Sequence, residues 1–150
     1  MFAIEIDPEC KLITIRLSGL LTVEEVERLL HQEQSAVVAL GYRSGEHLLL
    51  VDASGCVIQS QEVIAAFQAA VAATRLSAAR VAVVCGPSLT LLQTQRILLV
   101  RENTRIDATE VEARAWLMRA DSFSRAAPGS SAPSAPPVAP GHAPARPRRS

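Results

Sequence analysis

Two short, uninterrupted apolar runs constrain the fold of this 150-residue chain most strongly. They are Leu-Leu-Leu-Val at residues 48–51 and Val-Ala-Val-Val at residues 81–84. Runs of this length without polar alternation are typical of strands that are covered on both faces, as in a parallel sheet. A helix-length segment separates the two runs, so we predict central parallel strands joined by a crossover helix. We expect the first strand to end at residue 51, with Asp-Ala-Ser-Gly at residues 52–55 forming a turn.

The N-terminal segment has the apolar–polar alternation of two strands joined as a β-hairpin. Apolar and polar residues alternate over residues 2–7 and again over residues 12–17, and Pro8-Glu9-Cys10 separates the two runs. Strict alternation indicates strands with one buried face, and a short polar connection joins such strands in antiparallel fashion.

Residues that favour a helix N-terminus precede the segments in which apolar residues recur with the helical period of 3.6. Thr22 and Glu25 have the spacing of a capping box, which predicts a helix over residues 23–40 that ends at Gly41. Ser60 precedes an Ala-rich helical pattern and is a candidate N-cap. Further patterns predict a helix over residues 88–99, a short strand at residues 104–106, and a last helix from residue 107 or 108. In the last helix we expect Val111, Ala115 and Met118 to share one side, with Trp116 beside them.

The predicted order is therefore β-β-α-β-α-β-α-β-α. We expect an α/β domain with a mixed sheet that has a parallel centre and an antiparallel N-terminal hairpin. The domain should span residues 1–120, in which 14 acidic and 11 basic side chains give a net charge of −3. Residues 121–150 are rich in Pro and Ala and carry a net charge of +3. That composition predicts a disordered basic tail, because it buries too little apolar surface to offset chain entropy.

Composition argues against several classes of enzyme. The three cysteines are widely spaced and the three histidines show no ligand spacing, so we expect no metal site, and His31 and His47 are interpreted as surface or boundary residues. Neither a dinucleotide-binding glycine motif nor a phosphate-binding loop occurs, so no cofactor is expected. The absence of a signal-peptide pattern and of a membrane span predicts a cytoplasmic protein.

One segment gathers polar groups at the predicted carboxyl end of the central strand, where such folds bind ligands. The candidate partner or ligand surface consists of Asp52, Ser54, Gly55, Gln59, Ser60 and Glu62. Asp52 could act as an acid or base, and Ser54 or Ser60 as a nucleophile, but the sequence places no base beside either hydroxyl. The alternative is that Asp52 and Ser54 make turn hydrogen bonds while Ser60 caps a helix. We therefore expect no catalytic residues.

The order of elements and two phrases resemble the STAS domain, in particular bacterial SpoIIAA-like proteins. The phrases are Leu-Leu-Leu-Val-Asp-Ala-Ser-Gly-Cys-Val-Ile-Gln-Ser-Gln-Glu-Val, from residue 48, and Glu-Val-Glu-Ala-Arg-Ala-Trp-Leu, from residue 110. The resemblance covers residues 1–119. It implies a regulatory module of the anti-sigma-factor-antagonist type, in which a serine at the start of the second helix is phosphorylated.

The chain departs from the family at that switch. Regulatory members carry Asp-Ser-Ser-Gly there, whereas this chain has Gln59-Ser60-Gln61-Glu62, so the motif is not intact. The resemblance makes Ser60 the candidate phosphosite. A slip of one or two residues would instead place Gln61 or Glu62 at the switch, and Glu62 would then mimic a permanent charge. A phosphate on Ser60 would meet the free amides of a helix N-terminus, although Glu62 would repel it.

We therefore expect a non-catalytic protein-interaction module whose partner is a protein such as a regulatory kinase or an anti-sigma-like factor. The alternative is a domain that binds a small ligand, a lipid or a nucleotide, at the same strand ends, although the aliphatic core leaves little room for a lipid-sized cavity. Nucleic acid is not expected as a partner, since residues 121–150 carry only four Arg and no aromatic residue follows position 125. An apolar helix face has the same pattern in a monomer and in an oligomer, so the oligomeric state stays open.

Overall fold

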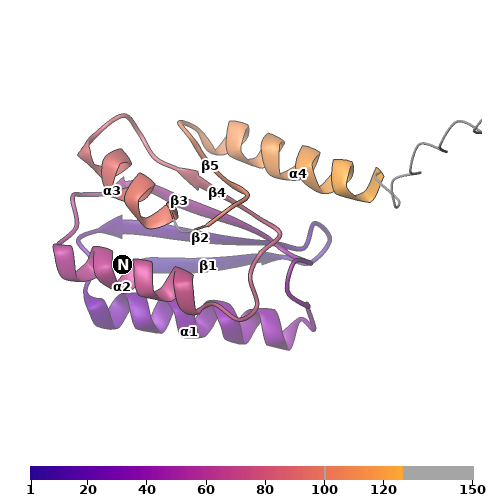
Figure 1. The fold of residues 1–150 in the computed structure, drawn as a ribbon, viewed down its shortest axis with the longest axis horizontal. Helices are drawn as coiled ribbons and strands as arrows, with labels where there is room; N and C mark the ends of the chain where they lie inside the picture. Colours follow the sequence, from indigo (N-terminus) through magenta and orange to yellow (C-terminus); the bar gives the residue numbers. More distant parts are fainter. Residues whose placement is uncertain (100, 127–150) are drawn as a thin grey trace, which may run out of the picture.

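The computed structural model describes residues 1–99 and 101–126, which form one α/β unit (Figure 1). Its elements follow the predicted order. They are β1 (Phe2–Asp7), β2 (Leu12–Gly19), α1 (Val23–Ala39), β3 (Leu48–Cys56), α2 (Gln61–Ala73), β4 (Arg80–Val84), α3 (Leu89–Leu98), β5 (Thr104–Asp107) and α4 (Glu110–Ala126).

The five strands form one mixed sheet in the spatial order β1-β2-β3-β4-β5. β1 and β2 pair in antiparallel fashion with Phe2 opposite Leu17, and β2, β3, β4 and β5 are mutually parallel. The predicted hairpin and parallel centre are therefore confirmed. Because β3 and β4 are interior strands covered on both faces, their apolar runs lack polar alternation.

The helices cover the two faces of the sheet unequally. Ile13 and Ile15 of β2 pack against α1 and α2, and Val81 and Val83 of β4 pack towards α3 on the same face. On the opposite face, Leu12, Leu48, Leu50, Ala82 and Val84 contact Ala113 and Leu117 of α4. Three helices therefore lie on one face, and a single helix lies on the other (Figure 1).

Side-chain hydrogen bonds cap the first three helices at the positions that the sequence predicts. The Thr22 hydroxyl accepts from the Glu25 amide at 3.1 Å, and the Glu25 carboxylate accepts from the Thr22 amide at 2.9 Å, which completes the capping box. Ser60 and Ser88 cap α2 and α3 through their hydroxyl oxygens. Gly41, just after the end of α1, adopts φ +72°, a conformation that favours glycine.

Two predicted details are wrong. β3 does not end at residue 51 but continues to Cys56, because Ser18 and Gly19 of β2 pair with Gly55 and Cys56 after a register shift. Pairing with a neighbouring strand thus overrides the low strand propensity of Asp, Ser and Gly. In α4 the buried stripe is not the predicted one. Ala113 and Leu117 are fully buried, whereas Val111 is 79% exposed. The helix also continues past residue 120, and residues 127–150 of the predicted tail lie outside the described residues.

Candidate functional site

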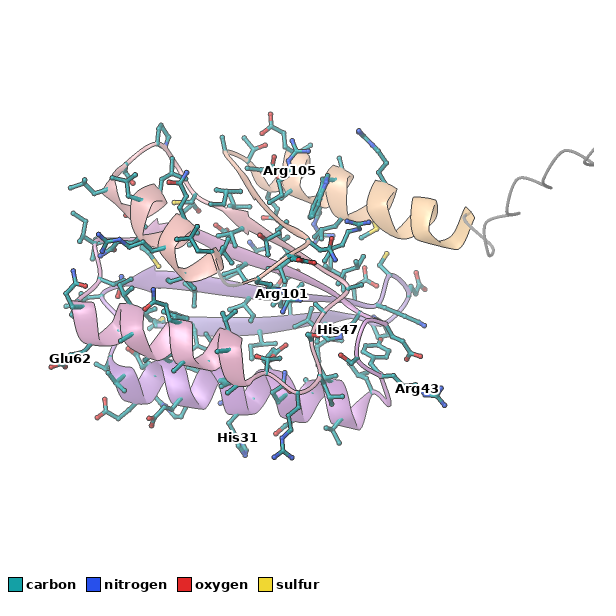
Figure 2. The ribbon with its side chains drawn as sticks, viewed as in Figure 1. His31, Arg43, His47, Glu62, Arg101 and Arg105 are labelled. Atoms are coloured by element: carbon teal, nitrogen blue, oxygen red, sulfur yellow. The ribbon has the colours of Figure 1, made fainter. Side chains whose placement is uncertain are left out.

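The carboxyl ends of the parallel strands bring three connections together at one end of the sheet. These are the β2–α1 loop, the β3–α2 loop and the start of α3. Ser60 lies at this end, is exposed, and accepts a hydrogen bond from the Val63 amide at 3.2 Å. Glu62 is exposed two residues further on and lies at the opposite end of the molecule from His47 (Figure 2). The Ser60 hydroxyl is therefore a helix cap that solvent can reach.

Gln59 joins the three connections. Its side-chain oxygen accepts from the Leu21 amide at 2.8 Å, and its side-chain nitrogen donates to the Gly19 and Val57 carbonyls at 2.9 and 2.7 Å. Its backbone N–H and C=O both bond to the side chain of Gln93 in α3, each at 2.9 Å. Gln59 is only 8% exposed, so it does not lie on the surface as predicted but holds the neighbouring loops in place.

Exposed apolar side chains surround this hydrogen-bonded junction. We call Leu20, Val57, Ile58, Leu89 and Leu92 the apolar edge, and each of them is more than half exposed. Ile58 and the two leucines of α3 line a shallow groove together with Leu99, which is 81% exposed. The predicted helical pattern of α3 is present, but Leu92 and Leu99 point outward while Thr94 is buried. The sequence pattern does not predict this surface, and its only local signal is the Val57-Ile58 pair in a loop.

Three carboxylates lie at the helix starts near the apolar edge, and one cation, Arg96, lines the groove itself. Glu24 and Glu25 lie in the first turn of α1, and Glu62 lies in the first turn of α2. Carboxylates at these positions interact favourably with the helix dipole. The backbone hydrogen bond from Thr22, assisted by the N-terminal ammonium, holds the pKa of Glu25 below its usual value. This end of the sheet therefore combines apolar contact area with negative charge.

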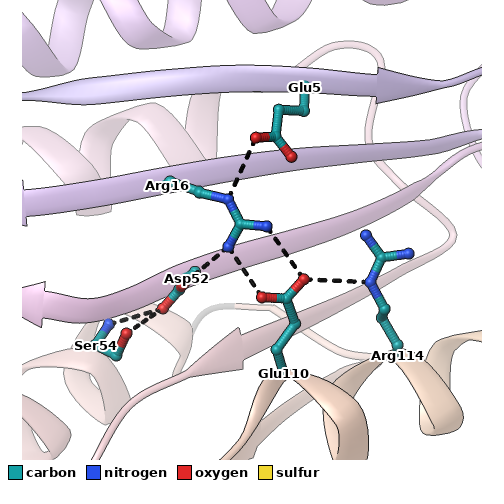
Figure 3. Close-up of polar contacts among 6 residues, drawn as sticks. All are labelled: Glu5, Arg16, Asp52, Ser54, Glu110 and Arg114. Atoms are coloured by element: carbon teal, nitrogen blue, oxygen red, sulfur yellow. Dashed lines mark hydrogen bonds and ion pairs between the residues drawn. The ribbon is translucent and has the colours of Figure 1, made fainter.

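Asp52 and Ser54 belong to a separate polar network on the α4 face of the sheet (Figure 3). The Ser54 amide and hydroxyl both donate to Asp52, at 3.0 and 2.5 Å. Arg16 of β2 binds Asp52 at 3.0 Å, Glu110 at 2.9 and 3.2 Å, and Glu5 at 3.4 Å. The structure thus separates the predicted surface into two parts, because Asp52 and Ser54 are paired on the α4 face whereas Ser60 and Glu62 lie beside the apolar edge.

The Arg16 network is electrostatic in character. Hydrogen bonds to Glu110 and Glu5 raise the pKa of Arg16, and the guanidinium of Arg16 in turn lowers the pKa of Glu110. Arg114 adds a second cation, 3.3 Å from Glu110. With Asp52 engaged by Arg16 and the Ser54 hydroxyl donating to Asp52, this arrangement stabilises charge and provides no imidazole to activate the serine.

Gly55 has a steric role at the same register shift. A Cβ atom added there would lie 3.2 Å from the Leu17 carbonyl oxygen and 3.3 Å from the Ser18 Cβ atom. These distances are tighter than ordinary van der Waals contacts, so the close approach of β2 and β3 favours glycine at this position.

The remaining chemistry-bearing residues do not converge on the apolar edge. Within residues 1–99 and 101–126, no three His, Cys, Asp or Glu side chains gather as metal ligands. His31 is exposed on α1, but His47 is fully buried at the amino end of β3, which corrects the surface or boundary interpretation. Its imidazole stacks on Tyr42 with ring centroids 6.1 Å apart. In the described part of the chain, no helix is long and apolar enough to cross a membrane.

The order of strands and helices, with a hairpin leading into a parallel sheet, defines an α/β protein with a STAS-like, SpoIIAA-like fold. One similar structure is an uncharacterized protein of the DUF3478 family with a SpoIIAA-like fold from Shewanella loihica PV-4. It matches with a TM-score of 0.60 and 19% identity over 77% of this chain and 93% of that one. Another is the anti-sigma factor antagonist SpoIIAA in its unphosphorylated form, with a TM-score of 0.51 and 19% identity over 77% of this chain and 96% of that one. No protein-family model matches the chain, and no curated protein matches it.

Proposed function

We propose that this domain is a non-catalytic protein-interaction module that binds a regulatory protein through the apolar edge. The observation that carries the proposal is the exposure of five large apolar side chains around the Ser60 cap. Contiguous apolar surface of this kind, rimmed by polar groups, is typical of protein-binding sites. Gln59 and Gln93 fix the loops that carry these side chains, so the surface is preorganised and binding costs less ordering entropy.

The chemistry of the surface sets the character of the partner. Glu24 and Glu62 are exposed beside the apolar side chains, so the matching surface should present an apolar anchor flanked by basic groups. A regulatory kinase or an anti-sigma-like factor is the partner that the SpoIIAA-like fold suggests. One solved structure with this fold is described as an anti-sigma factor antagonist in its unphosphorylated form.

Phosphorylation of Ser60 would regulate this binding. The hydroxyl is exposed, and a phosphate there would meet the free amides at the start of α2. It would add about two negative charges to a surface that already carries Glu24 and Glu62, and so strengthen the electrostatic attraction of a basic partner. Glu62, two residues further on, opposes the modification itself by like-charge repulsion.

Affinity purification of the full chain from its source organism, with mass spectrometry of bound proteins and of phosphate on Ser60, would identify the partner. The purified partner would then be titrated against Leu92→Asp and against Val111→Asp as the matched control. Both positions are more than half exposed, but Val111 lies on α4, on the opposite face of the sheet. We expect Leu92→Asp to weaken binding at least about tenfold and Val111→Asp to leave it unchanged. Equal binding by the two variants would refute the assignment of the surface.

A further inference from the structure

A partly open apolar cavity lies between the sheet and the three helices on its α1–α3 face. Its volume is about 170 Å³, and apolar side chains of β2, β3, β4 and all three helices line it, among them Ile15, Leu29, Val51, Phe67, Val83 and Leu98. A cavity of about 150 Å³ lined by such side chains is large enough to hold a benzene molecule. The space in this protein therefore matches a ligand of about one aromatic ring and is too small for a lipid.

Most polar side chains that line the cavity are already satisfied by the protein. The Gln93 side chain donates to the Gln59 backbone carbonyl, and the Gln59 side chain donates to the Gly19 carbonyl. The hydroxyls of Thr74 and Thr94 donate to backbone carbonyls one helical turn earlier, at 2.8 and 2.9 Å. Neither the two glutamines nor Thr74 and Thr94 would gain from a ligand. These groups line the cavity without requiring a polar partner inside it.

Two charged lining residues retain unused hydrogen-bonding capacity. Arg101 follows α3 and donates from one terminal nitrogen to the Ala78 carbonyl at 2.6 Å, but its buried Nε–H has no partner among the described residues. Glu33 of α1 is 6% exposed, and one of its oxygens accepts from Gln34 at 2.7 Å. Its other oxygen lies 3.8 Å from the His47 Nε2 atom, beyond hydrogen-bonding distance. The cavity thus offers one unpaired donor and one carboxylate oxygen with free lone pairs.

We propose that this cavity is a binding site for a small aromatic molecule that carries a single hydroxyl group. The ring occupies the apolar space, and the hydroxyl accepts from the Arg101 Nε–H while donating to Glu33. A hydroxyl can pair with either kind of group, because it is both donor and acceptor. A carboxylate ligand would pair with Arg101 but be repelled by Glu33, and an ammonium ligand would pair with Glu33 but be repelled by Arg101, whereas a neutral hydroxyl is repelled by neither. The site is distinct from the apolar edge and needs no protein partner.

The test uses p-cresol as the probe and toluene as the matched molecule without the hydroxyl. Both would be titrated into the full chain while methyl NMR signals of Ile15, Val83 and Leu98 are followed. We expect saturable shifts of these lining methyls with p-cresol, and binding about tenfold weaker for toluene, since toluene leaves the Arg101 donor unpaired. Absence of saturable p-cresol shifts at these methyls would overturn the proposal, as would shifts confined to the apolar edge.

Cavity-filling variants locate the site. Ala70 of α2 lines the cavity, whereas the adjacent Ala69 is exposed and does not. Ala70→Leu should abolish p-cresol binding, and Ala69→Leu should retain it; equal binding by the two variants contradicts the site. If Ala70→Leu fails to fold, Arg101→Met replaces it as the decisive variant. That substitution keeps an apolar side chain but removes the Nε donor, so p-cresol should then bind no better than toluene, and a retained preference for p-cresol refutes the role of Arg101.

Discussion

Arg16 and Asp52 are register partners on adjacent parallel strands, with a nitrogen–oxygen distance of 3.0 Å. The same guanidinium also binds Glu110 at the start of α4 and Glu5 on β1. One cation therefore connects two neighbouring strands and the only described helix on that face of the sheet. The pair fixes Asp52 in a structural ion network and removes it from the surface around Ser60.

Replacing Arg16 should make stability less dependent on acid pH. Because Arg16 depresses the pKa of Glu110, the pairing stabilises the fold above the unfolded pKa of that carboxyl, near 4.5, and this stabilisation is lost as pH falls through the lower folded pKa. Arg16→Met should cost about 1–2 kcal/mol at neutral pH, a figure reduced for the partial exposure of the network. The cost should be smaller at an acid pH below 4.5, where Glu110 becomes protonated in the folded protein as well. Urea unfolding at both pH values measures this, with Arg119→Met, an exposed position on α4, as the control.

The buried stripe of α4 can be tested with two truncations. Leu117→Ala removes a fully buried side chain and should destabilise the protein by about 2–5 kcal/mol, through lost burial and the cavity left behind. Val111→Ala, at a position that is 79% exposed, should change stability by less than about 0.5 kcal/mol. Urea unfolding curves compare the two. A larger loss at Val111 would show that the other face of the helix is packed.

Ser60→Ala should cost about 1 kcal/mol, because it removes the oxygen that accepts from the Val63 amide. Ser60→Asp keeps a capping oxygen and should leave stability close to that of the wild type, since an acidic side chain also suits the helix N-terminus. Thermal and urea unfolding distinguish the variants. A Ser60→Asp protein as unstable as Ser60→Ala would contradict the capping role and would also disqualify it as a phosphoserine mimic.

Gln59→Ala should be far more disruptive than Gln61→Ala. The first substitution leaves the Leu21 amide and the Val57 carbonyl without the Gln59 side chain, and leaves the Gly19 carbonyl with only the Val57 amide at 3.4 Å, at a cost of about 2–4 kcal/mol. Gln61 is exposed at the start of α2, and its truncation should change stability by less than about 0.5 kcal/mol. Hydrogen exchange gives a second measurement, because the Leu21 amide should lose protection in Gln59→Ala. Retained protection would show that the junction does not depend on Gln59.

Cys56 should react slowly with alkylating reagents in the folded protein. Burial raises the pKa of its thiol to about 11, from 9.0, so little thiolate is present near neutral pH. The neutral thiol favours the fold below pH 9.0, and this stabilisation is lost as pH rises towards about 11. Peptide-resolved alkylation in native and urea-unfolded protein measures the difference. Equal rates in the two states would contradict the burial of this residue, and Cys56→Ala removes the labelled peptide as a control.

The sequence predicted those parts of the candidate site that depend on local structure. Ser60 and Thr22 could be assigned as caps because a cap needs only its own side chain and amides within three residues. The grouping of Asp52 with Ser60 was not correct, because the extension of β3 depends on pairing with residues 18 and 19, more than 30 positions earlier. The acidic and apolar character of the edge could be read from residues 57–62, but its continuation over α3 could not.

By itself the sequence determined the class of fold, the order of its elements, the parallel centre of the sheet and the starts of three helices. Hydrophobic period and capping chemistry are local properties, so they are visible without coordinates. Only the tertiary structure decided which sides of α3 and α4 are buried and which carboxylates bind Arg16. It also decided how Gln59 joins three loops, and that a cavity lined by Glu33 and Arg101 lies under the helices. Each of these depends on contacts between residues distant in the chain, and such contacts are set by packing over the whole domain.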